Sequence, residues 1–183
     1  IIRSNSSPSG WYHNNIKKIF YRIIVSLADE IIVNSDQFKK QMEKMLNRKV
    51  NRIYNPLNKV EILKKSSINF KNSFYKKKDL KIINIGRLTD QKDQITILKA
   101  INNLKNIIKV KLIIIGRGNE KNNLQNYIKK NNLKDKIQIK DPNKNVFSYL
   151  KSADLFVLSS KYEGLPNVLL EALTLKKFII STN

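Results

Sequence analysis

Beyond residue 79 the chain alternates short, almost wholly apolar runs with longer stretches of helical periodicity, and this alternation constrains the fold more than any other feature. The apolar runs lie near residues 81–85, 111–115, 137–140, 154–158 and 178–181. Runs such as Leu112-Ile113-Ile114-Ile115 lack the polar alternation of a half-exposed strand and are typical of strands covered on both faces. The pattern therefore predicts an α/β fold with a Rossmann-like parallel sheet.

The first part of the chain repeats this alternation on a smaller scale. Ile31-Ile32-Val33 is predicted to be a strand, and Ser35 stands where an N-cap would begin a helix that runs through Leu46. Residues 50–54 are predicted to form another strand, which Asn55-Pro56 ends because the residue before proline is pushed out of helical geometry. We place a domain junction at this point.

Residues 14–28 are predicted to form an amphipathic basic helix. Its apolar positions recur at helical spacing, with basic residues largely on the opposite side. The apolar set is Ile16, Ile19, Phe20, Ile23, Ile24 and Leu27, and the basic set is Lys17, Lys18 and Arg22. Two interpretations stay open: the apolar face packs against the rest of its own domain, or it lies on an anionic membrane surface.

The amino-acid composition excludes some kinds of metal and disulfide site. The sequence has no cysteine and one histidine, His13, which rules out disulfides and thiolate metal sites and disfavours a histidine-based metal centre. We expect no metal and no cofactor. No apolar stretch reaches the roughly 20 residues that cross a bilayer, and a reducing, cytoplasmic compartment fits the lack of cysteine.

The chain is strongly basic, with 36 Lys and Arg against 14 Asp and Glu, for a net charge of +22. Such a charge attracts phosphate, whether in nucleotides, nucleic acid or anionic lipid. Lys, Asn and Ile are all abundant, as expected of an AT-rich genome, so the charge permits an anionic ligand without identifying one.

Ligands of parallel sheets bind beyond the carboxyl ends of the strands, so the turns after the predicted strands are the candidate sites. The first turn contains Gly86, Arg87 and, five residues on, Lys92. Gly86 would let the backbone approach a ligand, and the two cations at a helix mouth would neutralise a diphosphate. The alternative is that both cations are merely solvated.

The second turn is Gly116-Arg117-Gly118, which resembles half of a phosphate-binding fingerprint. Residue 121 is Lys where a third glycine would stand, which disfavours a dinucleotide site. A tight strand-to-helix turn with no ligand explains these glycines equally well.

The third turn carries two acids on either side of a helix start. Pro166 suits the first helical turn, so Glu163 lies in the preceding loop while Glu171 lies about one and a half turns into the helix. Free N–H groups at the helix mouth suit a phosphate, and carboxylates accept hydrogen bonds from sugar hydroxyls. This combination indicates a nucleotide sugar. The alternative is that Glu163 caps the helix and Glu171 faces solvent.

The string from Ala153 to Leu173, ADLFVLSSKYEGLPNVLLEAL, closely resembles the donor-site motif of the retaining GT-B glycosyltransferases sometimes called family four. Its E-x7-E spacing is met by Glu163 and Glu171. A second family segment, G-R-L followed by Lys-Asp, is matched at residues 86–88 and 92–93. Upstream, residues 28–35 and 54–56 resemble the end of the family's acceptor-binding domain and its hinge.

The resemblance implies a division of the chain and a role for each motif. Residues 1–57 would end the N-terminal acceptor-binding domain, itself Rossmann-like, and residues 80–183 would bind the nucleotide sugar. The residues between them, 58–79, are lysine-rich with little periodicity, and this composition predicts a linker or a surface excursion. Arg87 and Lys92 would hold the diphosphate. The implied donor-binding set is Gly86, Arg87, Lys92, Glu163, Gly164, Leu165, Pro166, Asn167, Val168 and Glu171, with Glu163, Arg87 and Lys92 as the catalytic residues.

The chain also departs from the family pattern. Most of the N-terminal sheet is absent, and the chain stops at Asn183 before the expected closing helices, so we expect this piece alone to be inactive. Many members place a histidine on the N-terminal side of the cleft, where this chain has Ser4-Asn5-Ser6. His13 lies further on beside Trp11 and receives no role.

The resemblance implies transfer of a hexose-type sugar from a nucleotide diphosphate sugar to an acceptor hydroxyl, with retention at the anomeric carbon. The acceptor would be a glycan, a lipid-linked sugar or a lipopolysaccharide-type molecule of the bacterial cell envelope. We expect a cytoplasmic protein, with peripheral contact at the inner face of the membrane as one option. A GT-B nucleotide-sugar epimerase is the enzymatic alternative. A basic nucleic-acid-binding protein is disfavoured, because it has no need of two acids at a helix mouth.

Overall fold

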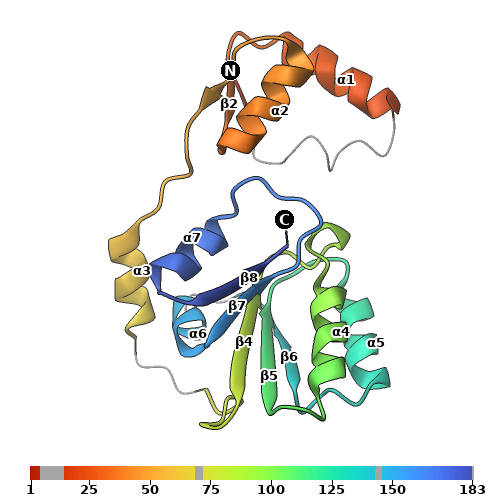
Figure 1. Ribbon diagram of the computed structural model, residues 1–183, viewed down its shortest axis with the longest axis vertical. Helices are drawn as coiled ribbons and strands as arrows, with labels where there is room; N and C mark the ends of the chain where they lie inside the picture. Colours follow the sequence, from red (N-terminus) through yellow and green to blue (C-terminus); the bar gives the residue numbers. More distant parts are fainter. Residues whose placement is uncertain (5–14, 69–71, 143–145, 183) are drawn as a thin grey trace. The chain divides into compact units, whose positions relative to one another are not determined.

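The computed structural model describes residues 1–4, 15–68, 72–142 and 146–182. The chain forms two compact units (Figure 1). The first unit comprises residues 1–56 and 162–167, and the second comprises residues 57–161 and 168–183. The finer division at residues 57, 79 and 80 stays a prediction.

The first unit contains a three-stranded parallel sheet in the order β1-β2-β3. Its strands are β1 (Ile2–Ser4), β2 (Ile31–Val33) and β3 (Asn51–Arg52), and its helices are α1 (Asn15–Ser26) and α2 (Asp36–Leu46). The predicted cap is confirmed, because the Phe38 N–H donates to Ser35 Oγ at 3.2 Å. Phe38 and Met42 of α2 are fully buried against β2, as the predicted strand-then-helix order requires.

Helix α1 confirms the predicted amphipathic helix but buries only a small part of its surface. Val25 is 1% exposed and packs with Ala28 in the core of the first unit. The predicted apolar set is exposed, with values that run from 52% for Ile24 to 79% for Leu27. The main apolar face of α1 is therefore not covered by the described part of the chain.

The second unit is built on a five-stranded parallel sheet in the order β6-β5-β4-β7-β8. Its strands are β4 (Leu80–Ile85), β5 (Val110–Ile115), β6 (Ile137–Lys140), β7 (Leu155–Leu158) and β8 (Phe178–Ser181). Its helices are α3 (Lys59–Ser66), α4 (Gln94–Leu104), α5 (Lys121–Lys130), α6 (Val146–Ser152) and α7 (Asn167–Thr174), with a 3-10 turn, η2, at Asp90–Lys92. All five predicted strands are confirmed to within one residue, and so is their parallel pairing.

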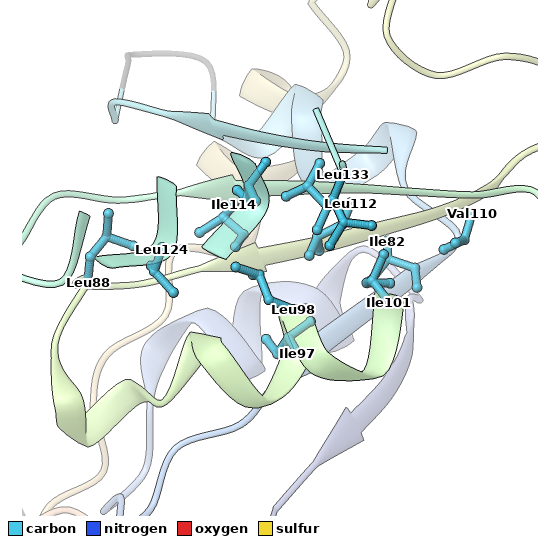
Figure 2. Close-up of a cluster of buried hydrophobic side chains, with 12 residues drawn as sticks. Ile82, Leu88, Ile97, Leu98, Ile101, Val110, Leu112, Ile114, Leu124 and Leu133 are labelled. Carbon is cyan, nitrogen blue, oxygen red and sulfur yellow. The ribbon is translucent and has the colours of Figure 1, made fainter. Parts of the chain in front are cut away.

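Helices cover both faces of this sheet, which explains the near-continuous apolar strands. One face packs against α4 and α5 and contains Ile82, Leu112 and Ile114 (Figure 2). The neighbouring strand residues, such as Ile83 and Ile113, point to the other face, where they pack with residues of α6 and α7. Alternate residues of one strand thus belong to two separate cores.

Helix α3 lies inside the segment for which the sequence predicts a linker. Asn58 Oδ1 accepts from the Glu61 N–H at 3.0 Å and caps the helix, and Ile62 is 4% exposed. Ser148 Oγ of α6 donates to the Lys65 carbonyl at 3.1 Å. The segment therefore packs as part of the second unit and is not a free tether. The sequence does not reveal this helix, because lysines surround its few buried positions.

No helix in the described part of the chain is both long enough and apolar enough to cross a membrane.

Candidate functional site

The turns predicted to carry chemistry follow neighbouring strands of the second unit. Strand β4 lies between β5 and β7, and all three run parallel. Their carboxyl ends therefore meet at one edge of the sheet, where ligands of such sheets bind. The turn after Ile85 is the middle one of the three.

The turns after β4 and β5 are interlocked through their backbones. The Leu88 N–H donates to the Arg117 carbonyl at 2.8 Å, and the Glu120 N–H donates to the Leu88 carbonyl at 3.0 Å. A Cβ atom on Gly116 would lie 1.9 Å from the Gly86 oxygen, which is far inside van der Waals contact. Close backbone packing thus accounts for the glycines of the second turn, without a ligand.

The first turn presents its two cations from a well-anchored loop. Leu88 is fully buried, and the buried Gln94 side chain donates to the Arg87 carbonyl at 2.9 Å. Arg87 itself is exposed, whereas Lys92 is half-buried. A Cβ on Gly86 would meet the Lys92 Cδ and Cε atoms at 3.8 Å, so the Lys92 side chain extends back toward Gly86.

The end of β7 is fastened to this loop by residues that sequence reasoning missed. Ser159 Oγ lies 2.9 Å from the Lys92 carbonyl oxygen and 2.8 Å from that of Asp93. The Lys161 N–H donates to the Gln91 carbonyl at 2.8 Å, and the Lys161 ammonium pairs with Asp90. The sequence signal for the Ser159 contact is weak: Ser159 is a small polar residue that directly follows an apolar strand.

Glu163 and Glu171 occupy the local structures that the sequence predicts. Glu163 lies in the irregular segment between β7 and α7, and Pro166 immediately precedes α7. Glu171 is the fifth residue of that helix, and burial raises the pKa of its carboxyl above the ordinary value. Glu171 is therefore half-buried at this point of the helix.

The segment that carries Glu163 is held by a residue of the predicted hinge, and both belong to the first unit. The Asn55 amide donates to the Leu165 carbonyl at 3.1 Å and to Asn167 Oδ1 at 2.7 Å. The sequence predicts Asn55-Pro56 as a strand stop and, by resemblance, as part of the hinge. The structure adds a further role, because the Asn55 amide also restrains the backbone just ahead of α7.

Among the described residues, no group of three or more His, Cys, Asp or Glu side chains is arranged to hold a metal ion. All the predicted donor-binding residues belong to the described part of the chain. His13, Trp11, Asn5 and Ser6 lie outside it.

Comparison with known proteins identifies the family. The family model for "Glycosyl transferases group 1" matches residues 65–183. An uncharacterized glycosyltransferase of Methanocaldococcus jannaschii is 36% identical over 193 residues, which cover 100% of this chain and 47% of the relative. The Campylobacter jejuni N-acetylgalactosamine-N,N'-diacetylbacillosaminyl-diphospho-undecaprenol 4-alpha-N-acetylgalactosaminyltransferase is 28% identical over 196 residues, which cover 100% of this chain and 50% of that relative. The chain spans about half the length of these relatives.

Solved structures show the same fold at low sequence identity. Anabaena HepE in complex with UDP matches with a TM-score of 0.79 at 16% identity, over 98% of this chain and 52% of HepE. TarM of S. aureus matches with a TM-score of 0.73 at 18% identity, over 98% of this chain and 36% of TarM. The predicted GT-B α/β fold is thereby confirmed. Together, the family match over residues 65–183 and the shared fold show that this chain belongs to the group 1 glycosyltransferases.

Proposed function

We propose that the complete protein transfers a sugar from a nucleotide diphosphate sugar to an acceptor hydroxyl, with retention at the anomeric carbon. The observation that carries this proposal is the anchored loop after β4, which presents Arg87 and Lys92 beside Gly86 at the ligand-binding edge of the sheet. Structural neighbours support a nucleotide-sugar donor, because Anabaena HepE was solved with UDP-glucose and pneumococcal GtfA with UDP and GlcNAc.

In this proposal the cations act on the leaving group. Negative charge grows on the departing diphosphate as the glycosidic bond breaks. Arg87, Lys92 and the N–H groups of residues 164–168 would therefore stabilise the transition state more than the ground state. Arg87 suits a bidentate contact with phosphate oxygens, whereas Lys92 supplies a compact point charge.

The two acids would hold opposite ends of the donor. The half-buried carboxylate of Glu171 would accept hydrogen bonds from the ribose hydroxyls. Glu163 would hold the transferred sugar and stabilise the positive charge that grows on its ring. Neither role requires a covalent nucleophile, and we assign no residue as one.

We propose a glycan or a lipid-linked sugar as the acceptor. One relative is named for a diphospho-undecaprenol acceptor, and another is named for amylovoran biosynthesis in Erwinia amylovora. Residues 1–57 would belong to the acceptor-binding domain, and residues 80–183 to the donor-binding domain. The protein would work in the cytoplasm, where the exposed apolar face of α1 would pack against the rest of its own domain or touch the inner face of the membrane.

Two measurements on the complete protein test the proposal. Calorimetric titration with UDP, GDP and an oligonucleotide should show tight binding of one diphosphate, and only weak, salt-sensitive binding of the oligonucleotide. A panel of nucleotide sugars, scored for released diphosphate in the presence of lipid-linked acceptors, should identify the donor. Formation of an epimerised nucleotide sugar without transfer to an acceptor would favour the epimerase. Tight oligonucleotide binding alone would contradict the proposal.

A further inference from the structure

We infer that Ser159 is a positioning residue for Lys92, which it fixes by holding the backbone of the turn that carries this cation. The inference rests on the nucleotide-sugar site proposed above. It concerns the hydroxyl of Ser159, which touches neither donor nor acceptor in that proposal.

The geometry joins a buried hydroxyl to two successive carbonyls. Ser159 is 4% exposed, and its Oγ lies 2.9 Å from the oxygen of Lys92 and 2.8 Å from that of Asp93. A serine hydroxyl has one hydrogen to donate, so the two carbonyls share it. The backbone at the Lys92–Asp93 peptide is therefore tied directly to the end of β7.

This peptide lies where the backbone needs restraint. Asp93 adopts the left-handed conformation, with φ of 46° and ψ of 46°, between the 3-10 turn and α4. A residue other than glycine visits this conformation reluctantly, so surrounding contacts must hold it. Ser159 supplies such a contact, and the Thr96 hydroxyl, which donates to Asp93 Oδ2 at 2.7 Å, supplies another.

The same contact connects two motifs that are about 70 residues apart in the sequence. Residues 90–93 carry Lys92, whereas residues 159–161 lead into the segment that carries Glu163. The Lys161 N–H bond to the Gln91 carbonyl, at 2.8 Å, runs beside the Ser159 contact. Removal of the Ser159 hydroxyl would leave this second bond in place, so the turn should loosen without detaching.

Ser160 offers a matched control. It is 3% exposed, almost as buried as Ser159, and among the described residues its Oγ has no hydrogen-bond partner. Ser160→Ala removes the same atoms from the adjacent position without breaking a contact to the Lys92 turn. A defect caused merely by the loss of a buried hydroxyl at this strand end would appear in both variants.

The test is calorimetric titration of the complete protein with whichever of UDP and GDP the wild type binds. Ser159→Ala should weaken nucleoside diphosphate binding about threefold to tenfold, as expected for one neutral hydrogen bond. Ser160→Ala should stay within about twofold of wild type. On a Lys92→Ala background, Ser159→Ala should cause almost no further loss, because its effect passes through Lys92.

Steady-state kinetics gives a readout that a general loss of stability would not produce. Ser159→Ala should raise the KM for the donor about as much as it weakens the diphosphate, with the KM for the acceptor unchanged. A partly unfolded enzyme would instead lose apparent kcat with both KM values unchanged. Should the alanine variant fail to fold, Ser159→Cys keeps nearly the same size with a much weaker donor and carries the same expectations.

Each outcome decides between the two proposals. Wild-type affinity in a folded Ser159 variant, or a Ser159 effect that adds fully to that of Lys92→Ala, overturns the positioning role while the nucleotide site stands. If the wild-type protein binds neither diphosphate and releases none from any donor, the proposed function itself is wrong.

Discussion

The backbone of Gly118 lies so close to that of Leu88 that a Cβ atom on Gly118 would fall 2.1 Å from the Leu88 oxygen and 2.6 Å from its carbonyl carbon. Gly118→Ala should therefore force the turns after β4 and β5 apart. We expect it to lower the free energy of unfolding by about 1–3 kcal/mol or more, as overpacking of a rigid site does. Urea denaturation followed by circular dichroism measures this change.

Gly86→Ala is the matched control for that prediction. Among the described residues, a Cβ at Gly86 would meet only the Lys92 side chain, at an ordinary contact distance of 3.8 Å. We expect the stability of this variant to stay close to wild type, while the new methyl group takes the space through which the Gly86 backbone would approach the diphosphate and so weakens its binding. Equal destabilisation by both glycine substitutions would contradict the interlocked geometry.

Arg87→Ala and Lys92→Ala should each weaken binding of the nucleoside diphosphate at least tenfold. The reason is that a charge-assisted hydrogen bond to phosphate contributes about 1.5–3 kcal/mol. Titration calorimetry on the complete protein provides the measurement. Lys99→Ala, which removes an exposed cation from α4, is the control and should leave the affinity unchanged. Unaltered affinity in both loop variants would mean that these cations are merely solvated.

Glu163→Ala and Glu171→Ala should show different kinetic defects. Glu171→Ala should raise the donor KM and weaken the free diphosphate, because contacts to the ribose exist equally in the ground and transition states. Glu163→Ala should mainly lower kcat and leave diphosphate affinity nearly intact, because that ligand has no sugar. Kinetics with the donor, combined with diphosphate titration, separates these patterns, and the same loss in every parameter would refute the division of roles.

The half-buried carboxyl of Glu171 should make the stability of the fold depend on pH. Burial raises its pKa in the folded state, so the folded protein binds the proton more tightly than the unfolded chain does. The charged form therefore destabilises the fold at neutral pH, and this penalty disappears as the pH falls below the ordinary carboxyl value of about 4.3. Glu171→Gln should be more stable than wild type at pH 7 and equally stable near pH 4.

Glu61→Gln provides a control of opposite sign for the pH prediction. Its ion pair with Lys65, at 2.5 Å, lowers the pKa of the Glu61 carboxyl. Stability from this pair is present above the ordinary carboxyl pKa and is lost as the pH falls, so Glu61→Gln should be slightly less stable than wild type at pH 7. Urea denaturation at several pH values measures both variants, and a shared sign would show that the Glu171 effect is not electrostatic.

The exposed apolar face of α1 should be covered in the complete protein by the rest of the first domain. In that case Ile19→Ser with Ile23→Ser should lower the free energy of unfolding by about 2 kcal/mol or more, since two large apolar side chains lose their burial. If this face is covered, the complete wild-type protein should also fail to sediment with anionic vesicles, even at low salt. The opposite outcome would support membrane contact: the wild-type protein sediments with the vesicles, and the double variant does not sediment although its stability is unchanged.

The sequence predicts those parts of the fold that depend on local periodicity. Continuous runs such as Leu112-Ile113-Ile114-Ile115 are recognisable because a strand covered on both faces has no polar side. Ser35 is recognisable as a cap because capping involves residues only three apart. Helix α3 is missed, because its single buried stripe lies among lysines that dominate the local composition.

The contacts of the site itself are harder to predict, because they join residues that are distant in sequence. Nothing near Gly118 indicates that the backbone of Leu88 will lie against it. Likewise, the sequence around Ser159 does not show that its hydroxyl reaches the turn of Lys92. Motif spacing predicts which loops carry the chemistry, whereas only the folded chain shows how they support one another.

The interlocked turns also limit how such a site can diversify during evolution. Gly116 and Gly118 face backbone atoms that cannot move without opening the sheet edge, so neither position tolerates a side chain. Substitutions at these two positions are therefore excluded from any adaptation to a new sugar. If the proposed donor site is correct, such substitutions would have to lie elsewhere, for example in the segment between β7 and α7.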